Sequence, residues 1–474
     1  MKAKFIIPCI ALAIAALMGT ACSKMHGPEN PDNGSPQKRQ VSTLVTPEMA
    51  VANVERFISS FEPAVKSGVK RTIASLHVSG RDMMPTKSGT SSTSDTISVS
   101  GPDETPFVYI ANFSDDRGFC VVPGDTRLPE VLIYVDEGRL MPGDTIDNPG
   151  LAMYLEMADT YYRMTTGMPV LELNTGTWRA YGDEGYPDDL FIATDDEDEG
   201  EDEITYEYSD WKQVALIGAE EKIDLKWNQK PPFNKYCFTD AGEQAVAGCV
   251  PVAVALLMSY HGKDINYYGT EYDWDLMRTV VNGNSGTPEA QDMVATLIRQ
   301  LGWKINLDAT YGIKGTGADP KRIDTAFKNF GYAHHGTYTK YDSDKGLALG
   351  PIIARGDAFR KIHTWKIFGL TILQWSEYYS GHDWVISHKI TLQRDKHKYI
   401  NDDLAETVSE EREYVHCNWG WGGSYNGYYF DKVFDVSDDS HPEFQNPDEL
   451  NTKSIEGEDN YFRYVLRMHY GVKP

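Results

Sequence analysis

The sequence predicts an α+β protein with two folded domains behind a short N-terminal leader. The chain has 474 residues, which is too long for one ordinary globular core. Eight of the nine residues at 195–203 are acidic, and a run of this kind stays solvated and marks a linker. Patterns typical of helices and strands occur on both sides of the run. We therefore expect one domain at 46–194, an acidic linker with the processing region at 195–215, and a second domain at 216–474.

The composition excludes two broad classes of protein. Hydrophobic residues make up 41% of the chain and aromatic residues 12%, which excludes general disorder. The formal net charge of −25 at pH 7 argues against a nucleic-acid partner, because a phosphate backbone would be repelled. We interpret the charge as a feature that favours solubility.

The N-terminus is typical of an export signal at 1–21. Lys2 and Lys4 precede an apolar stretch at 6–18 that is too short for a permanent membrane helix. Residues 19–23 resemble a bacterial lipobox, although Gly19 replaces the usual leucine. This resemblance implies a lipoprotein of the periplasm or cell surface, lipidated at Cys22, with simple secretion as the alternative. The lipid anchor is then the one membrane contact that we expect. Polar residues at 22–45 predict a flexible tether.

The first domain begins with a helix. Thr46 provides an N-cap, Pro47 stands at the first helical position, and apolar residues follow at Ala50, Val54 and Phe57 on one face. The next elements are strands and one more helix, separated by turns rich in polar residues. In chain order we predict a loose surface loop at 86–105, a hairpin formed by 107–110 and 119–122, a strand at 128–134 and a helix at 151–166.

The cysteines suggest a reactive thiol. Besides Cys9 of the signal and Cys22 of the lipobox-like residues, four remain: Cys120, Cys237, Cys249 and Cys417. No Cys-x-x-Cys pair exists, so a zinc site and a thioredoxin-type motif are both absent, and the acidic run lacks the spacing of a calcium loop. We expect no metal and no cofactor. One free, reactive cysteine is the most economical interpretation.

Cys249 is the candidate nucleophile. Gly248 precedes it, and the nearly continuous apolar run at 250–258 predicts a buried helix. Pro251 would lie in the first turn, where a missing N–H costs nothing. A thiol at the N-terminus of a helix is stabilised as the thiolate by the free N–H groups and the macrodipole. On this segment alone, a plain buried cysteine is an equally good interpretation.

Three further side chains could complete a catalytic site. His382 precedes a short apolar strand, although His261, His388 and His416 are rivals. The side-chain oxygen of Asn418 could accept the imidazole N–H, and Trp419 could shield that bond, but packing in a strand and turn explains both residues equally well. The amide of Gln229 and the N–H of Cys249 could hold an oxyanion. A surface glutamine is the alternative for Gln229.

Taken together, the short sequence motifs that contain these residues resemble the streptopain family of papain-like cysteine peptidases. They are Trp-x-Gln…Pro-x-Asn at 227–234, Gly-Cys-Val at 248–250, Gly-His-x-Trp-Val-Ile at 381–386 and Asn-Trp-Gly-Trp-Gly-Gly at 418–423, with a glycine-rich loop at 311–317. Residues 109–114 and 118–125 resemble the propeptide of the family. The resemblance implies a papain-like catalytic domain, with a helical half carrying the cysteine and an antiparallel sheet half carrying the histidine and asparagine, behind a separate α+β prodomain.

The resemblance also implies an activity. Cys249 would be the nucleophile, His382 the general base and acid, and Asn418 the residue that orients the imidazole, in an endopeptidase for proteins or peptides. It would be made as a zymogen whose own prodomain inhibits it inside the same chain. An inactive homologue that acts as a surface binding protein, and a Cys-His acyltransferase such as a transglutaminase, are the alternatives.

The sequence departs from the family pattern in four places. Ser387-His388 stands where Asp-Gly is usual, and Leu256 replaces a glutamine. A charged insertion occupies 394–412, and 352–380 shows no close match. These departures affect the expected shape of the substrate cleft but remove no catalytic group.

Overall fold

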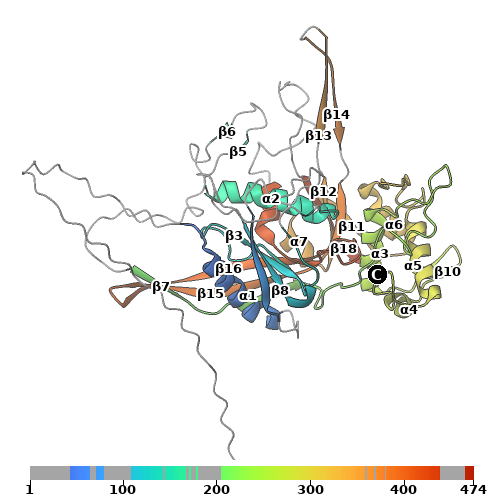
Figure 1. Ribbon diagram of the computed structural model, residues 1–474. Helices are drawn as coiled ribbons and strands as arrows, with labels where there is room; N and C mark the ends of the chain where they lie inside the picture. The colour runs from blue at the N-terminus through green and yellow to red at the C-terminus, as the bar shows by residue number, and fades with distance from the viewer. Residues whose placement is uncertain are drawn as a thin grey trace, which may run out of the picture. The chain divides into compact units, whose positions relative to one another are not determined.

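The computed structural model describes residues 43–64, 71–79, 108–141, 144, 146–166, 170–171, 178–179, 204–357, 360–367, 370–378, 381–437 and 465–474 (Figure 1). The predicted signal, nearly all of the predicted tether, the loop at 86–105 and the acidic run at 195–203 lie outside these residues. No helix in the described ranges is long and apolar enough to cross a membrane.

The N-terminal part, residues 43–179, is an antiparallel meander with two helices. The predicted hairpin is confirmed, because β2 and β3 pair antiparallel with Ile110 opposite Val121. The strand predicted at 128–134 is short and begins only at Ile133. Helix α1 buries Ala50, Val54 and Phe57 of the predicted apolar face, and Phe61 as well. The elements are α1 (Pro47–Ala64), β1 (Ile73–Ser79), β2 (Val108–Phe113), η2 (Ser114–Asp116), β3 (Phe119–Pro123), β4 (Ile133–Val135), α2 (Pro149–Thr166), β5 (Val170–Leu171) and β6 (Trp178–Arg179).

The helical part, residues 219–329, surrounds the predicted buried helix. Helix α3 begins at Cys249 after Gly248, whose φ of 94° favours glycine, and every residue at 250–259 is buried. It ends at Gly262 in the left-handed conformation, a common helix C-cap. The elements are α3 (Cys249–His261), β9 (Asn266–Tyr267), β10 (Thr270–Glu271), α4 (Trp274–Arg278), α5 (Pro288–Leu301), η3 (Pro320–Arg322) and α6 (Ile323–Asn329).

The sheet part, residues 330–474, follows in the chain and includes a long hairpin. Strand β15 begins at His382 and β16 ends at Asn418, so the two predicted site residues lie at the same end of this hairpin. The elements are β11 (His334–Lys340), α7 (Ser343–Leu347), β12 (Ile352–Asp357), β13 (Arg360–Ile367), β14 (Leu370–Tyr378), β15 (His382–Ile400), β16 (Asp403–Asn418), β17 (Gly427–Phe430), η4 (Asp431–Ser437) and β18 (Val465–Lys473).

The predicted α+β class is confirmed, and strands of both predicted domains belong to one sheet. Among the described residues, twelve strands form one sheet, in the order β1-β2-β3-β4-β17-β16-β15-β12-β18-β11 with β7 and β8 paired to β15. Strand β4 joins the N-terminal part to the sheet part by pairing with β17, with Tyr134 opposite Tyr428. Gly427 makes this close pairing possible, because a Cβ there would lie 2.3 Å from the Tyr134 carbonyl oxygen. We call this pairing the β4–β17 joint.

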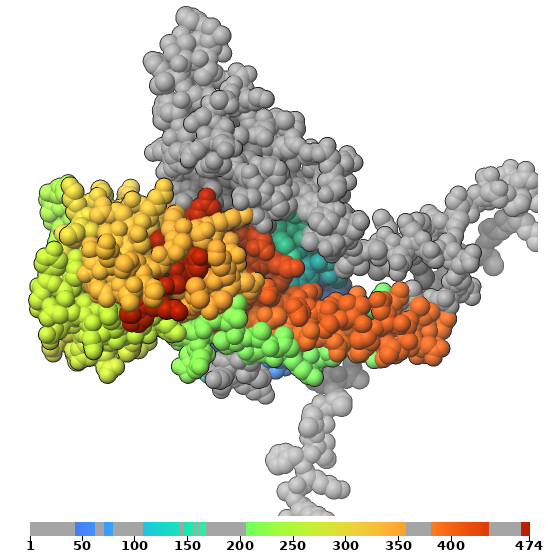
Figure 2. Space-filling view, turned by 180° about the vertical axis from the view of Figure 1, so that it is seen from behind, coloured from blue at the N-terminus to red at the C-terminus, as the bar shows by residue number. Residues whose placement is uncertain are grey.

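The far half of the β15–β16 hairpin contains the charged insertion at 394–412. Strands β7 (Ile204–Tyr208) and β8 (Lys212–Gly218) extend along β15, as the green and orange segments of Figure 2 show. The guanidinium of Arg394 lies 4.2 Å from the ring centre of Tyr208 and 4.4 Å from that of Trp211. It also pairs with Glu410 of β16 at 2.7 Å. The second half of the predicted linker therefore packs on the hairpin, while the domain boundaries stay predictions.

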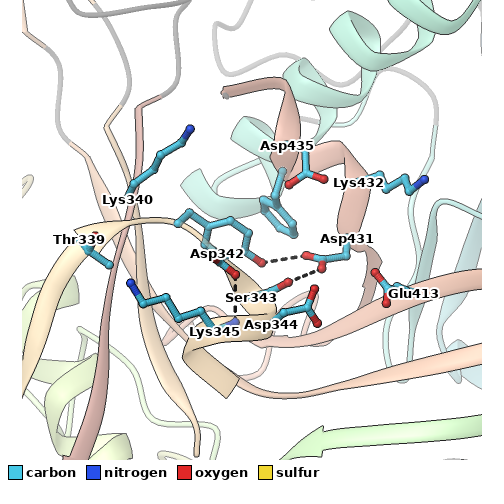
Figure 3. A pocket seen from close by; sticks show the side chains of 12 residues that line it. Thr339, Lys340, Asp342, Ser343, Asp344, Lys345, Glu413, Asp431, Lys432 and Asp435 are labelled. Carbon is cyan, nitrogen blue, oxygen red and sulfur yellow. Dashed lines mark hydrogen bonds between the residues drawn. The ribbon is translucent and has the colours of Figure 1, made fainter. Parts of the chain in front are cut away.

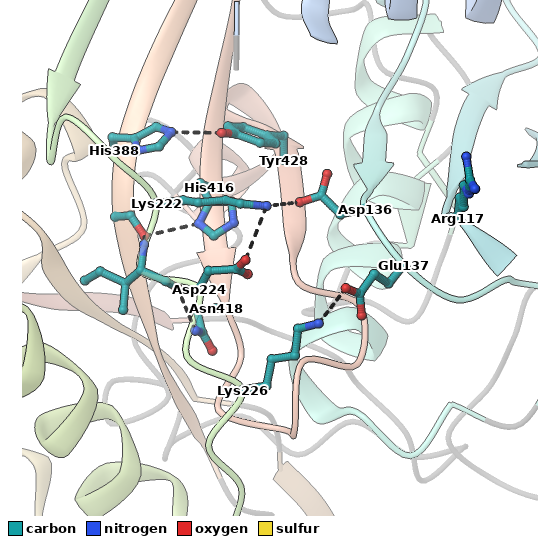
Figure 4. A network of polar contacts seen from close by, with 12 residues as sticks. Arg117, Asp136, Glu137, Lys222, Asp224, Lys226, His388, His416, Asn418 and Tyr428 are labelled. Atoms are coloured by element: carbon teal, nitrogen blue, oxygen red, sulfur yellow. Dashed lines mark hydrogen bonds and ion pairs between the residues drawn. The ribbon is translucent and has the colours of Figure 1, made fainter. Parts of the chain in front are cut away.

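Polar groups reinforce the β4–β17 joint (Figure 4). Lys222 pairs with Asp136, and Lys226 Nζ lies 2.5 Å from Glu137 Oε1. In the same network His388 Nε2 lies 3.0 Å from the Tyr428 hydroxyl, and its ring stacks on that of His416.

Both histidines of the joint are buried and are held neutral. Burial, with the nearby Lys222 cation, lowers the pKa of His388 to about 4. Burial, with His388 and Lys222 beside it, lowers the pKa of His416 well below its usual 6.5. Asp136 and Asp224 are the anions near Lys222. The joint therefore has no protonated histidine at neutral pH.

This arrangement predicts an acid-sensitive joint. Because the folded state favours neutral His388, its contribution to stability is complete above pH 6.5 and is lost as the pH falls towards 4. The loss in unfolding free energy is up to about 1.4 kcal/mol per pH unit for that histidine. We expect the unfolding free energy of His388→Gln, which can still bond Tyr428, to depend less steeply on pH. Urea unfolding between pH 7.5 and 4.5 measures this dependence. The comparison uses full-length chains that also carry Cys249→Ala. Equal slopes of unfolding free energy against pH, with and without His388→Gln, would contradict the prediction.

Candidate active site

Cys249 lies at the first position of α3, half-buried against the core of the helical part. The glycine-rich loop at 311–317 positions the chain that leads to it. Thr316 Oγ1 donates to the Val246 carbonyl at 2.6 Å, and the Val246 N–H donates to the Gly312 carbonyl at 3.1 Å. A Cβ on Gly248 would lie 3.1 Å from Thr316 Cγ2, so the loop packs directly on the turn before the thiol.

Gln229 is tied to the same segment. Its backbone carbonyl accepts a hydrogen bond from the N–H of Ala247 at 2.9 Å, two residues before the thiol. The residue is buried, and the neighbouring Trp227 anchors this segment by donating its indole N–H to the Val280 carbonyl at 2.7 Å. The structure therefore places the Gln229 backbone two residues from Cys249 along the paired segment. The oxyanion role of the Gln229 amide stays a prediction.

By the alternation of side chains along β15, His382 lies on the sheet face opposite to that of its neighbour Asp383. Nε2 of His382 lies 2.8 Å from the carbonyl oxygen of Trp419, which can only accept, so Nε2 carries a proton. The ring is 3% exposed and is surrounded by the indoles of Trp384, Trp419 and Trp421, with centroid separations of 6.3, 6.3 and 5.9 Å. This is the side of the sheet on which the core of the N-terminal part lies.

The carboxylate of Asp383 lies beside the thiol instead. Its Oδ2 is 3.8 Å from Cys249 Sγ and 2.6 Å from Nη1 of Arg355 on β12. The Asp383 side chain is 1% exposed. Sequence reasoning missed both Asp383 and Arg355. The signal was a charged residue between the predicted base and an apolar strand, whose side chains point alternately to the two faces of the sheet.

Asn418 is fully buried at the end of β16, and its side chain holds the segment before the catalytic helix. Its Nδ2 donates to the carbonyls of Ile223 and Leu225 at 2.8 and 2.9 Å, and its Oδ1 accepts the N–H of Gly420 at 3.1 Å. The asparagine thus lies close to the histidine in the fold but bonds other groups in this arrangement. Its predicted role in orienting the imidazole stays a prediction.

Trp419 connects the site to the N-terminal part. It is fully buried, and its indole N–H lies 3.0 Å from both the Tyr425 carbonyl and the Tyr429 hydroxyl. The first turn of α2 packs on the indole, because a Cβ on Gly150 would lie 2.0 Å from Trp419 Cε3. Asn148 fixes this contact: its Oδ1 caps the N–H of Gly150 at 2.9 Å and its Nδ2 donates to the Ser424 carbonyl at 2.9 Å.

The electrostatics keep the thiol protonated. Burial, followed by the charge of Asp383, raises the pKa of Cys249 to about 12. Arg355 and the N–H groups of Asp383 and Val250 act in the opposite direction but are outweighed. At neutral pH this arrangement therefore favours the thiol of Cys249 over its thiolate.

The other predicted features concern cysteines and metals. All four described cysteines are free, and Cys120, Cys237 and Cys417 are buried. Within the described ranges no group of three or more His, Cys, Asp or Glu side chains has the arrangement of a metal site.

A pocket of about 380 Å³ lies elsewhere in the sheet part, between β11, α7, β16 and η4 (Figure 3). Its most buried anion, Asp431, accepts hydrogen bonds from Tyr341 and Ser343 and lies 3.4 Å from Lys389 Nζ. Burial alone would lower the pKa of the Lys389 ammonium, but Asp431, Asp344 and Glu413 together raise it. Lys389 thus offsets the charge of Asp431, and the pocket contains none of the predicted catalytic residues.

Comparison with known proteins agrees with the predicted resemblance. The Peptidase C10 family matches residues 227–429, and the family described as Spi protease inhibitor matches residues 42–162. Streptopain of Streptococcus pyogenes serotype M1 is 22% identical, over 71% of this chain and 76% of that protein. The thiol protease/hemagglutinin PrtT of Porphyromonas gingivalis is 21% identical, over 69% of this chain and 34% of that protein.

Two solved structures from Prevotella intermedia are also similar. A fragment of prointerpain A has a TM-score of 0.43 and 19% identity, covering 77% of this chain and 96% of that one. Active interpain A has a TM-score of 0.32 and 20% identity, covering 55% of this chain and 97% of that one. The two family matches establish that the chain carries a cysteine peptidase domain of the Peptidase C10 family, the family of streptopain, behind a domain of the Spi protease inhibitor family.

Proposed function

We propose that the protein is the zymogen of a cysteine endopeptidase and that the arrangement described above is its latent state. One observation carries the proposal: the helix-terminal thiol and the imidazole are present, but His382 bonds the Trp419 carbonyl while α2 of the inhibitor domain packs on the same tryptophan. The inhibitor domain thus acts on its own chain. Proteins or peptides are the substrates.

In the active state His382 accepts the proton of the Cys249 thiol, which gives a thiolate and an imidazolium. The thiolate attacks the scissile carbonyl carbon, and the oxyanion is held by the N–H of Cys249 and the amide of Gln229. The imidazolium then donates its proton to the leaving amine. Water hydrolyses the thioester with the imidazole as base, which restores the thiol. Asn418 orients the ring once its present partners at 223–225 have moved.

Latency follows from two separate contacts. The carbonyl of Trp419 holds the protonated Nε2 of His382 in a buried site, so moving the ring breaks a hydrogen bond and three aromatic contacts. The β4–β17 joint and the contact of Gly150 with Trp419 keep that site closed. Removal of the inhibitor domain abolishes the joint and the Gly150–Trp419 contact, so that the site opens and the His382 ring can leave the Trp419 carbonyl.

We also propose that the protein is exported, with lipidation at Cys22 as the first choice and simple secretion as the second. The basic start, the apolar stretch at 6–18 and the lipobox-like residues at 19–23 support this proposal.

The proposed nucleophile can be tested directly. We expect Cys249→Ala to lower casein cleavage by the processed protein by at least about 10³-fold, because the covalent route is removed. A cysteine-directed epoxide should label Cys249 in the processed protein and leave the variant unlabelled. Cys237→Ala serves as the matched control and should retain cleavage. Cleavage that survives Cys249→Ala, or amine incorporation without cleavage, would reject the endopeptidase.

The proposed latency contact can be tested at Gly150. In Gly150→Ala the added methyl overlaps the Trp419 ring, which should cost about 1–3 kcal/mol in the latent state. We therefore expect faster self-processing of the full-length chain, followed by gel electrophoresis over time. Gly138→Ala is the control, because its methyl meets no atom within 4 Å although its backbone is strained at φ 86°. Equal rates of self-processing in the two variants would contradict a specific role of the Gly150–Trp419 contact and indicate general destabilisation.

The two processing steps predict defined N-termini. We expect the exported precursor to begin at a lipidated Cys22 and the active form to begin between about 195 and 226. Mass spectrometry of both forms checks the prediction. An active form that retains residues 42–162 would contradict removal of the inhibitor domain as the activating step.

A further inference from the structure

We propose that Asp383 is a latency residue: its carboxylate occupies the position beside Cys249 that His382 must take, and it keeps the thiol protonated until activation. This inference rests on the proposed zymogen and deepens it. It assigns the inhibited state to a residue of the peptidase domain itself, in addition to the inhibitor domain.

The first argument is the alternation of side chains along a strand. Near its start β15 pairs regularly with β12, with Asp383 opposite Arg355 and Trp384 opposite Ala354. Successive side chains in such a strand point to opposite faces. Trp384 belongs to the core shared with the N-terminal part, whereas Val385 belongs to the core around α3. In this register, therefore, Asp383 faces the catalytic helix and His382 cannot.

The second argument is the contact itself. Oδ2 of Asp383 lies 3.8 Å from Cys249 Sγ, within hydrogen-bonding distance for a thiol donor, and Arg355 holds the same oxygen at 2.6 Å. A carboxylate can only accept, so the proton belongs to sulfur. An anion at this position opposes formation of a thiolate, which the helix N-terminus would otherwise favour.

The charged groups around the thiol determine whether each substitution should raise or lower the pKa of Cys249. Asp383 of β15 raises the pKa of Cys249, and Arg355 of β12 lowers it. The N–H groups of Asp383 and Val250 also lower it. On activation the start of β15 must turn so that His382 replaces Asp383 beside sulfur. The proton on Sγ then passes to the imidazole, and no other reactant is needed.

The experiment measures alkylation of Cys249 by iodoacetamide as a function of pH. The parent is the full-length chain with His382→Gln, which cannot form the proposed catalytic pair and can still donate to the Trp419 carbonyl. The modified peptide is quantified by mass spectrometry. We expect Asp383→Asn to raise the rate at pH 7.5 at least about tenfold, because a pKa lower by one unit gives tenfold more thiolate. We expect Arg355→Gln to lower it.

Three controls make the result decisive. Asp383→Glu retains the carboxylate and should alkylate at nearly the parent rate, and Asp240→Asn removes an exposed charge and should change nothing. Labelling of the fully buried Cys417 reports any unfolding. An Asp383→Asn rate within twofold of the parent overturns the proposal. So does equal acceleration by Asp383→Asn and Arg355→Gln, because simple loosening of the site would give that result. The readout needs no peptide cleavage, so its failure is distinct from failure of the endopeptidase, which Cys249→Ala tests.

Discussion

The pairing of β4 with β17 is the constraint on which the rest of the structure depends. It adds the strands of the inhibitor domain to the peptidase sheet and so places α1 and α2 against strands that carry the site. Tyr428 of β17 contacts Phe61 of α1 at 4.8 Å between ring centres, and Tyr154 of α2 contacts Tyr429 at the same separation. The core of the N-terminal part is therefore continuous with the core of the sheet part. An inhibitor that shares a core with its target excludes water from the contact and cannot leave without exposing apolar surface.

The geometry that we propose to be latent follows from this shared core. His382, Trp384 and Ile386 lie on the sheet face that the inhibitor domain covers, where aromatic side chains provide a closed site for the imidazole. The opposite face of the same strand packs on α3, so the residue next to His382 meets the thiol. The arrangement of β15 thus separates the His382 imidazole from the Cys249 sulfur and places the Asp383 carboxylate beside that sulfur.

Much of the site could be predicted from sequence because its parts are local. The helix after Cys249, the strand after His382 and the turn after Asn418 each carry their signal within about ten residues, and the structure contains all three elements. The β4–β17 joint could not be predicted, because it pairs segments almost 300 residues apart and neither segment encodes its partner. The direction of His382 was missed for the same reason: the face that a strand residue presents depends on register, and register is set by distant contacts.

One departure from the family pattern now has a structural explanation. Ser387 Oγ accepts the N–H of Ile223 and bonds His416, and His388 bonds Tyr428, so both residues serve the joint.

The proposed latency is a difference in free energy between two arrangements of the start of β15. A domain that binds one arrangement better than the other shifts the population by its differential affinity alone. The inhibitor domain contacts Trp419, which holds His382 on the covered face, so its affinity favours the separated thiol and imidazole. The Arg355–Asp383 pair favours the same arrangement from within the peptidase domain, because a buried carboxylate that loses its guanidinium partner is costly. Productive placement of His382 therefore requires Asp383 to find solvent or a new partner at the moment when the strand turns. In the proposed activation, removal of the inhibitor domain opens the covered face and supplies that solvent, which couples cleavage of the chain to formation of the catalytic pair.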